Sequence, residues 1–138
     1  MYFTLYADGG SRGNPGPAGA GSFVRDEEGV QVVTVSEYLG ITTNNIAEYT
    51  ALLRALEELR TLLGEASGEA VVDARLDSQL VVRQMNGEYK IKHPNIIPLA
   101  SRVKEVVRAF KTVSFTHVYR EDNKEADALA NEAMDRGH

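Results

Sequence analysis

The order of apolar and polar residues along the chain predicts five strands and four helices. Strands are indicated where β-branched and aromatic residues alternate with polar ones, and helices where apolar residues recur every three or four positions, as Leu52, Leu56 and Leu59 do. The expected strands cover residues 2–7, 20–25, 30–39, 70–76 and 113–119. The expected helices run from 44 or 45 to 63, from 78 to 85, from 94 onward, and from a cap at Asn123 to 136.

Glycine and proline residues mark the breaks between these segments. Residues 9–17 hold too many of them for regular structure, so we expect an irregular turn after the first strand. Residues 26–29 give a short hairpin signal. Asn44 or Asn45 can cap the long helix, and Pro94 can begin the third one because proline is tolerated in a first turn.

The resulting order, β-β-β-α-β-α-α-β-α, predicts an α/β protein with one five-stranded mixed sheet and helices on both faces. Two short hairpin links make the first three strands antiparallel, whereas helical crossovers make the last two parallel. No repeat, linker or low-complexity segment interrupts the 138 residues, a length that suits one domain. We therefore expect a single domain, residues 1–138.

Composition narrows the class of protein further. With 43% hydrophobic and 25% charged residues, the chain is typical of soluble globular proteins. No apolar run approaches the roughly 20 residues that cross a bilayer, and no secretory signal opens the chain, so we expect no membrane partner. The absence of cysteine excludes disulfides and thiolate chemistry and fits a cytoplasmic location. The net charge of -5 taken alone argues against nucleic-acid binding, although bound cations would invert the sign of an acidic site.

Four acidic residues fall where the pattern predicts an inward-facing or strand-end side chain. Two follow strands and two lie near the start of helices. Because such ends meet at one crevice of an α/β sheet, we expect the four to converge. Acids on core-facing stripes are costly unless they are paired or bind a cation. They are Asp8, Glu48, Asp77 and Asp127.

Each acid also has a local explanation. Asp8 could be a turn residue and Asp77 a helix N-cap, while Glu48 and Asp127 could compensate a helix dipole. Taken together, hard oxygen ligands without cysteine or an obligatory histidine suit Mg²⁺ or Mn²⁺. Two such ions about 4 Å apart can activate a water molecule and stabilise the leaving oxygen of a phosphoryl displacement.

The acids are embedded in four motifs: Asp8-Gly-Gly-Ser-Arg-Gly-Asn-Pro-Gly-Pro, Thr42-Thr-Asn-Asn-Ile-Ala-Glu48, Asp77-Ser-Gln and Asn123-Lys-Glu-Ala-Asp127-Ala-Leu-Ala. In their order and approximate spacing these motifs resemble type 1 ribonuclease H, over residues 2 to about 134. The resemblance implies an RNase H-like fold. It also implies a metal-dependent endonuclease that hydrolyses the RNA strand of RNA–DNA hybrids and leaves 5′-phosphate and 3′-hydroxyl ends.

The resemblance assigns a role to each acid by its motif position. All four are implied to be catalytic and to bind metal, as Mg²⁺ (two ions per site) or Mn²⁺. Asp8 would bridge both ions, Glu48 and Asp77 would hold one, and Asp127 the other. The partner implied is an RNA–DNA hybrid. No obligatory protein partner is implied, and we expect a monomer.

Substrate contacts are implied in the same motifs. A hybrid displays 2′-hydroxyls in a wide, shallow minor groove, which short amides can read. Thr43 and Asn44 would lie toward a phosphate of the DNA strand. The alternative for Asn44 and Asn45 is helix capping. The substrate contacts implied are Gly9, Asn14, Thr43, Asn44, Asn45 and Gln79.

The chain departs from the family pattern before the last acid. Many members carry a loop histidine there, whereas this chain has Arg120. A guanidinium is a poor general base near neutral pH, so we expect Arg120 to pair with the scissile or departing phosphate. The alternative is a salt bridge to Glu121 or Asp122. His117, on the opposite face, is expected to be structural.

A second departure concerns the grip on the substrate. Some members have a basic helix-and-loop protrusion, where this chain has only residues 85–94. Lys90 and Lys92 in that segment could contact phosphates or simply be solvated. We expect a short form without the protrusion or a preceding hybrid-binding domain, and therefore a weaker, more salt-sensitive grip.

Other activities share an acid-lined fold of this kind. The 3′–5′ exonucleases typically have Asp-x-Glu on the first strand, where this chain has Asp8-Gly-Gly, and transposase-like strand transferases usually lack the glycine-rich turn. A module that only binds hybrids or double-stranded RNA would be expected to have lost an acid. These activities stay as alternatives to the endonuclease.

Overall fold

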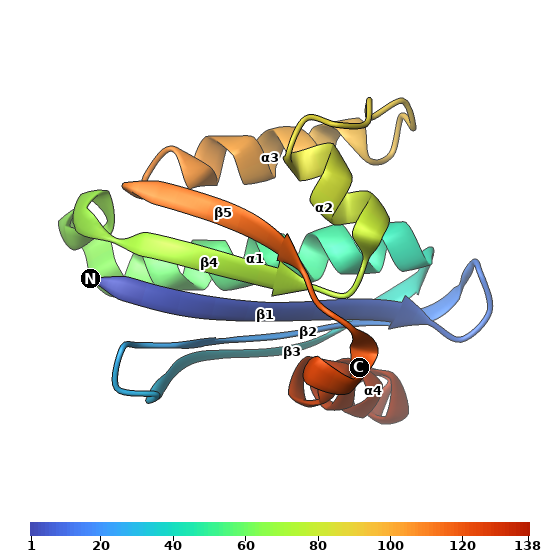
Figure 1. Cartoon of the computed structure of the whole chain (residues 1–138). Coiled ribbons are helices and arrows are strands. Elements are labelled where there is room, and N and C mark those ends of the chain that lie inside the picture. Colours follow the sequence, from blue (N-terminus) through green and yellow to red (C-terminus); the bar gives the residue numbers. More distant parts are fainter.

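The computed structural model describes residues 1–138 and has one five-stranded sheet with helices on both faces (Figure 1). The sheet order is β3-β2-β1-β4-β5. The strands are β1 (Tyr2–Ser11), β2 (Gly16–Arg25), β3 (Gln31–Thr42), β4 (Val71–Leu76) and β5 (Thr112–His117). The helices are α1 (Asn44–Leu63), α2 (Gln79–Met85), α3 (Ile97–Val107) and α4 (Lys124–Arg136), with short 3₁₀ turns η1 (Gly64–Glu69) and η2 (Arg120–Asp122).

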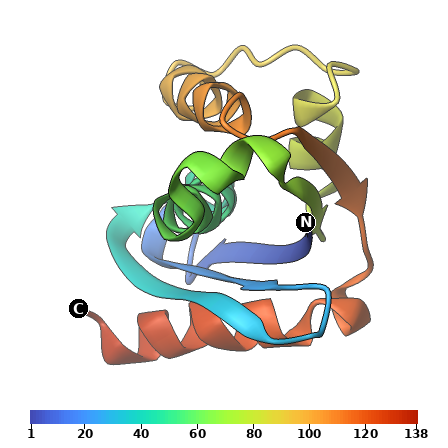
Figure 2. The same ribbon diagram turned by 90° about the vertical axis from the view of Figure 1, so that its left-hand side faces the viewer.

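The predicted mixed topology is confirmed. β1, β2 and β3 are antiparallel neighbours, and β4 runs parallel to both β1 and β5. α1 packs on one face of β1, β2 and β3, and α3 packs against α1. α4 lies on the opposite face of the same three strands (Figure 2). No helix has the length and apolar character needed to cross a membrane.

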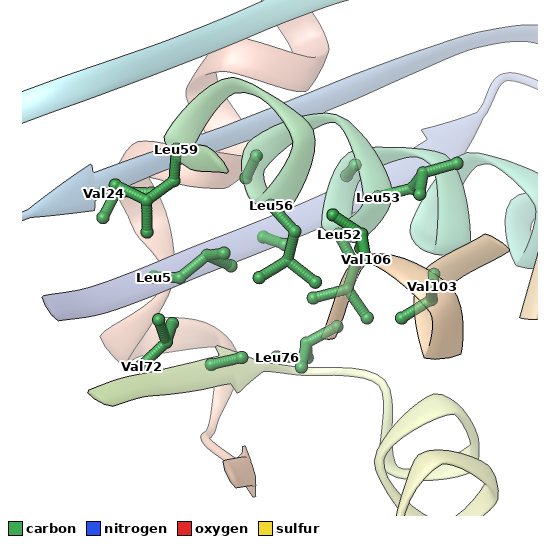
Figure 3. Close-up of a cluster of buried hydrophobic side chains, with 14 of the residues drawn as sticks. Leu5, Val24, Leu52, Leu53, Leu56, Leu59, Val72, Leu76, Val103 and Val106 are labelled. Atoms are coloured by element: carbon green, nitrogen blue, oxygen red, sulfur yellow. The ribbon is translucent and has the colours of Figure 1, made fainter. Parts of the chain in front are cut away.

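The main core fills the space between the sheet and α1 (Figure 3). Alternate residues of β1 and β4, such as Leu5 and Val72, point into it because successive strand side chains face opposite sides. α1 contributes leucines at helical spacing, and α3 closes the outer side with Val103 and Val106. This packing fixes the ends of β1, β4 and α1 relative to one another.

The α4 side is packed differently, through backbone rather than large side chains. A Cβ added to Gly21 would lie 2.3 Å from the carbonyl oxygen of Ala126, and one added to Gly19 would lie 2.5 Å from that of Ala130. Only glycine allows the helix backbone to approach the strand this closely. The two glycines therefore set the position of α4.

Several predicted boundaries were wrong. β1 continues to Ser11 and β2 begins at Gly16, so most of the segment expected to be irregular is hairpin. Its glycines serve close packing: a Cβ on Gly9 would lie 2.2 Å from the backbone of Ala47 in α1. The N-cap of α1 is Thr43, whose hydroxyl accepts a hydrogen bond from the Ile46 amide, and not Asn44 or Asn45.

Two later boundaries also differ. α3 begins at Ile97 rather than Pro94, because residues 94–96 form a turn in which the His93 carbonyl accepts hydrogen bonds from the Ile96 and Ile97 amides. Asn123 precedes α4 as predicted, but its side chain does not cap the helix. Its amide instead donates to the Ala7 carbonyl at 3.0 Å, which links the start of α4 to β1.

Candidate active site

The fold brings the four acids to one cavity of about 310 Å³. Ala7 is the last β1 residue paired with β4, opposite Leu76, so Asp8 in β1 and Asp77, directly after β4, are the next residues along two adjacent parallel segments. Glu48 lies in the second turn of α1, and Asp127 in the first turn of α4. Residues far apart in the chain therefore meet at the carboxyl end of the parallel strands, as expected.

Neighbouring groups hold the acids in place. The close contact at Gly9 holds α1, and with it Glu48, against β1. Ser78 accepts a hydrogen bond from the Val81 amide at the start of α2, and its hydroxyl beside Glu48 lowers the pKa of that carboxyl. The buried amide of Asn123 fixes the residue before Asp8 to the helix that carries Asp127. Sequence reasoning gave no site role to Ser78, although its place beside Asp77 is a local signal.

The electrostatics of the cavity disfavour negative charge. Burial, reinforced by Asp77, by a hydrogen bond to Asp127 and by the charges of Asp127 and Glu48, raises the pKa of Asp8 from 3.8 to about 8. Burial and the nearby Asp77 raise the pKa of Glu48 from 4.5 to about 7, against the opposing effects of Ser78 and Arg120. In this arrangement a proton or a cation must offset the crowded carboxylates.

The donor set fits a hard divalent cation. All the groups offered are oxygens, and Glu48 Oε2 is buried without any hydrogen-bond partner. No three His, Asp or Glu side chains are already arranged closely enough to enclose an ion. The four acids therefore share a cavity, and no three of them form a ready-made coordination site.

A second cavity, of about 470 Å³, adjoins the first and shares Asn44 and Glu48 with it. Its lining contains most of the predicted substrate contacts: Asn14, Thr43, Asn44 and Asn45. Gly9 lines the first cavity instead. Gln79 lines neither and lies exposed at the first residue of α2. His93 and Ile96 complete the second cavity, and the sequence gave no signal for them.

The amides of this region are partly committed within the protein. Asn44 Oδ1 accepts hydrogen bonds from the amide and hydroxyl of Ser11, at 2.8 and 3.1 Å. Asn14 Oδ1 accepts from the Asn44 amide at 3.1 Å, which ties the hairpin to the start of α1. The alternative of helix capping is wrong for both Asn44 and Asn45, since Thr43 has that role. These bonds hold the edge of the second cavity in a fixed shape.

Arg120 lines the acid cavity from η2 and makes no ion pair. The alternative salt bridge to Glu121 or Asp122 is absent. The Arg120 charge instead acts on Glu48, whose pKa it lowers. His117 lies outside the cavity, half-buried, with its ring edge-on to Tyr119 at 5.7 Å.

Comparison with known proteins gives this site a family. Residues 6–133 match the family model described as "Reverse transcriptase-like". A ribonuclease HI of Halobacterium salinarum is 42% identical over 130 residues, which cover 94% of this chain and 63% of that protein. The crystal structure of LC11-RNase H1 in complex with an RNA/DNA hybrid superposes with a TM-score of 0.91 at 44% identity, covering 97% of each chain. The chain belongs to the type 1 ribonuclease H family.

Two further matches differ in how much of the related protein this chain covers. The structure of RNase H1 from Halobacterium salinarum has a TM-score of 0.88 at 40% identity and covers 99% of both chains. A "bifunctional protein" of Mycobacterium tuberculosis is 41% identical over 98% of this chain, but the match covers only 36% of that protein. The chain thus spans about a third of the length of its mycobacterial relatives.

Proposed function

We propose that this member of the type 1 ribonuclease H family is an endonuclease that hydrolyses the RNA strand of RNA–DNA hybrids with divalent cations. The observation that carries the proposal is the cavity that gathers Asp8, Glu48, Asp77 and Asp127 beside a second cavity lined by asparagines. The hybrid bound in the LC11-RNase H1 structure supports the same substrate class.

The acids would hold two Mg²⁺ ions, or Mn²⁺, with Asp8 between them, Glu48 and Asp77 on one ion and Asp127 on the other. Bound there, the ions would supply an activated water and a counter-charge for the leaving oxygen. Products would carry 5′-phosphate and 3′-hydroxyl ends. Burial and neighbouring acids raise the pKa values of Asp8 and Glu48, so a cation that binds there would displace the protons that these carboxyls otherwise hold.

The second cavity would select the hybrid. Short amides such as those of Asn14 and Asn45 can hydrogen-bond to 2′-hydroxyls, which DNA lacks. No hydrogen bond within the protein engages the Asn45 side chain, so it is free to make one with substrate. Gln79 is exposed and follows Asp77 by two residues, and it would add a substrate contact outside the two cavities. Thr43 and Asn44 would face a phosphate of the DNA strand.

Arg120 would neutralise the phosphate at the cleavage site. Its guanidinium has no internal partner and lines the same cavity as the acids. A guanidinium is a poor proton donor and acceptor near neutral pH, so its role would be charge stabilisation and not proton transfer.

Basic residues of one segment would supply the wider grip on the duplex. Residues 83–111 contain seven Lys or Arg and only two Asp or Glu, in a chain of net charge -5. Lys90 and Lys104 line one groove there, between the segment before α3 and the helix itself. We expect this grip to be weaker and more salt-sensitive than in members with a basic protrusion. We also expect a monomer that acts in the cytoplasm.

Cleavage of end-labelled substrates tests the proposal. The hybrid is labelled on either strand and incubated with Mg²⁺, with Mn²⁺ or with a chelator, with double-stranded DNA and double-stranded RNA in parallel. We expect internal cuts in the RNA strand of the hybrid, only with metal, and a ligatable 5′-phosphate on the downstream product. Cutting from the 3′ end alone would favour an exonuclease, and binding without cutting would favour a binding module.

A further inference from the structure

Arg12 is a second arginine on the acid cavity, and none of the roles proposed above uses it. It follows β1 in the hairpin turn and lines the same cavity as Asp8 and Asp127. Its backbone is held firmly: its amide donates to the Pro17 carbonyl at 2.8 Å, and Gly16 packs so closely that an added Cβ would lie 2.1 Å from the Arg12 carbonyl oxygen. The side chain therefore extends from a fixed point on the cavity rim.

The guanidinium of Arg12 has only a replaceable partner. It contacts Asp135 of α4 at 2.6 Å, and the two side chains are 47% and 70% exposed. Solvent-exposed pairs of this kind contribute little to stability and are readily exchanged. A phosphate offers a guanidinium a stronger, bidentate arrangement. Arg12 can thus leave Asp135 for a phosphate that enters the cavity.

The composition of the cavity makes such a contact useful. Its lining has four carboxylates and only two cationic side chains, Arg12 and Arg120. Arg12 lies in the β1–β2 turn and reaches α4 through its ion pair with Asp135, whereas Arg120 lies in the turn η2 after β5. When one phosphate of a nucleic-acid strand lies among the acids, the next phosphate of the same strand lies one nucleotide further along. Arg120 and Arg12, which come from different elements, suit two successive phosphates of this kind.

We propose that Arg12 binds the RNA-strand phosphate next to the one that is cut, and that Asp135 holds its guanidinium in reach while the site is empty. The proposal rests on the hybrid-cutting function above. Arg12 would be a substrate-binding residue that sets KM and register along the strand, and Asp135 a competitor for the same guanidinium.

The opposing reading is that the ion pair simply fastens the hairpin to α4. The chain offers a matched control, because Arg25 and Glu125 also join the sheet to α4 at 2.6 Å with similar exposure. Arg25 lies outside the acid cavity, in a separate hollow with Tyr6. Breaking that pair removes a comparable fastening without touching the proposed phosphate contact.

Hybrid binding without metal and hybrid cleavage with Mg²⁺ are measured for Arg12→Gln, Arg12→Lys, Asp135→Asn and Arg25→Gln. We expect Arg12→Gln to raise Kd and KM about tenfold, with kcat within about twofold of wild type. The slope of log Kd against log salt should become shallower by somewhat less than one, as for one lost phosphate contact. Arg12→Lys should have Kd and KM values between those of wild type and Arg12→Gln. The control Arg25→Gln should match wild type. Asp135→Asn should bind the hybrid as well as wild type or more tightly.

The decisive signature is weaker binding by Arg12→Gln together with undiminished binding by Asp135→Asn, because both variants break the same ion pair. If both weaken binding equally, or if Arg12→Gln binds and cuts like wild type, Arg12 is only a fastening and the inference is overturned. If the wild-type protein itself does not cut the hybrid, the proposed function fails first and the inference fails with it.

Discussion

Replacing Asp8 with asparagine should stabilise the metal-free protein strongly at pH 8 and clearly less at pH 5. The folded protein raises the pKa of Asp8 to about 8, chiefly by burial and then by the charge of Asp77. A carboxyl that holds its proton more tightly when folded favours folding at low pH. That contribution is lost as pH rises from about 4 to about 8, where the unfolded chain releases the proton first. Asparagine carries no such penalty.

The size of the effect follows from the shift. A rise from 3.8 to about 8 corresponds to a ceiling of about 6 kcal/mol, at 1.36 kcal/mol per pH unit. The acids exchange protons as a group, and Asp8 keeps some contact with water, so we expect less than half of this, about 2 kcal/mol. For a domain of this length that is a rise in Tm of roughly 6–8 °C at pH 8.

Urea unfolding at pH 5, 6, 7 and 8 in the presence of a chelator measures the difference. Asp122→Asn, at an exposed position in η2, serves as the matched control and should show no pH-dependent gain. Added Mg²⁺ should then stabilise wild type more than Asp8→Asn, because the cation takes over the charge compensation. An Asp8→Asn variant equally stable to wild type at pH 8, or more stable by the same amount at pH 5, would refute the reasoning.

Three further changes test other parts of the structure. Gly21→Ala should cost about 3 kcal/mol in urea unfolding and most of the activity, since its Cβ would lie 2.3 Å from the Ala126 carbonyl oxygen and displace α4; an unchanged unfolding midpoint would contradict this. Arg120→Gln should lower kcat about tenfold or more in single-turnover cleavage while Kd for the hybrid changes little; wild-type kcat would exclude a role at the cleaved phosphate. Combined Lys90→Gln and Lys104→Gln should make the salt dependence of hybrid binding shallower by nearly two, and an unchanged slope would show that the groove does not contact the duplex.

The sequence predicted the element order because hydrophobic periodicity is a local property. The leucines of α1 and the alternation in β4 identify those elements without any tertiary information. The end of β1 could not be found that way. Gly9 and Gly10 suggest a turn by composition, yet both lie within the strand. Glycine is needed at position 9 because α1 approaches too closely for a side chain there. Only the tertiary packing distinguishes these two uses of glycine.

The same limit applies to the site. Convergence of the acids could be expected, since strand ends and helix starts meet at one edge of an α/β sheet. The surrounding groups could not, because Ser78, Asn131 and Met134 line the cavity only through the placement of α2 and α4. Asn123 was predicted to cap α4, but its amide is used for Ala7, a contact across 116 residues of sequence. Such long-range hydrogen bonds leave no local pattern.

The most direct test of the central claim is metal-dependent cleavage of an RNA–DNA hybrid by wild type and by Asp8→Asn, followed on both labelled strands as Mg²⁺ is titrated. The account predicts internal cuts in the RNA strand that appear with Mg²⁺, vanish with a chelator, and are lost in the variant although it stays folded. RNA-strand cleavage that persists without divalent metal, or full activity of Asp8→Asn, would contradict the assignment of the acids as the metal-binding catalytic centre.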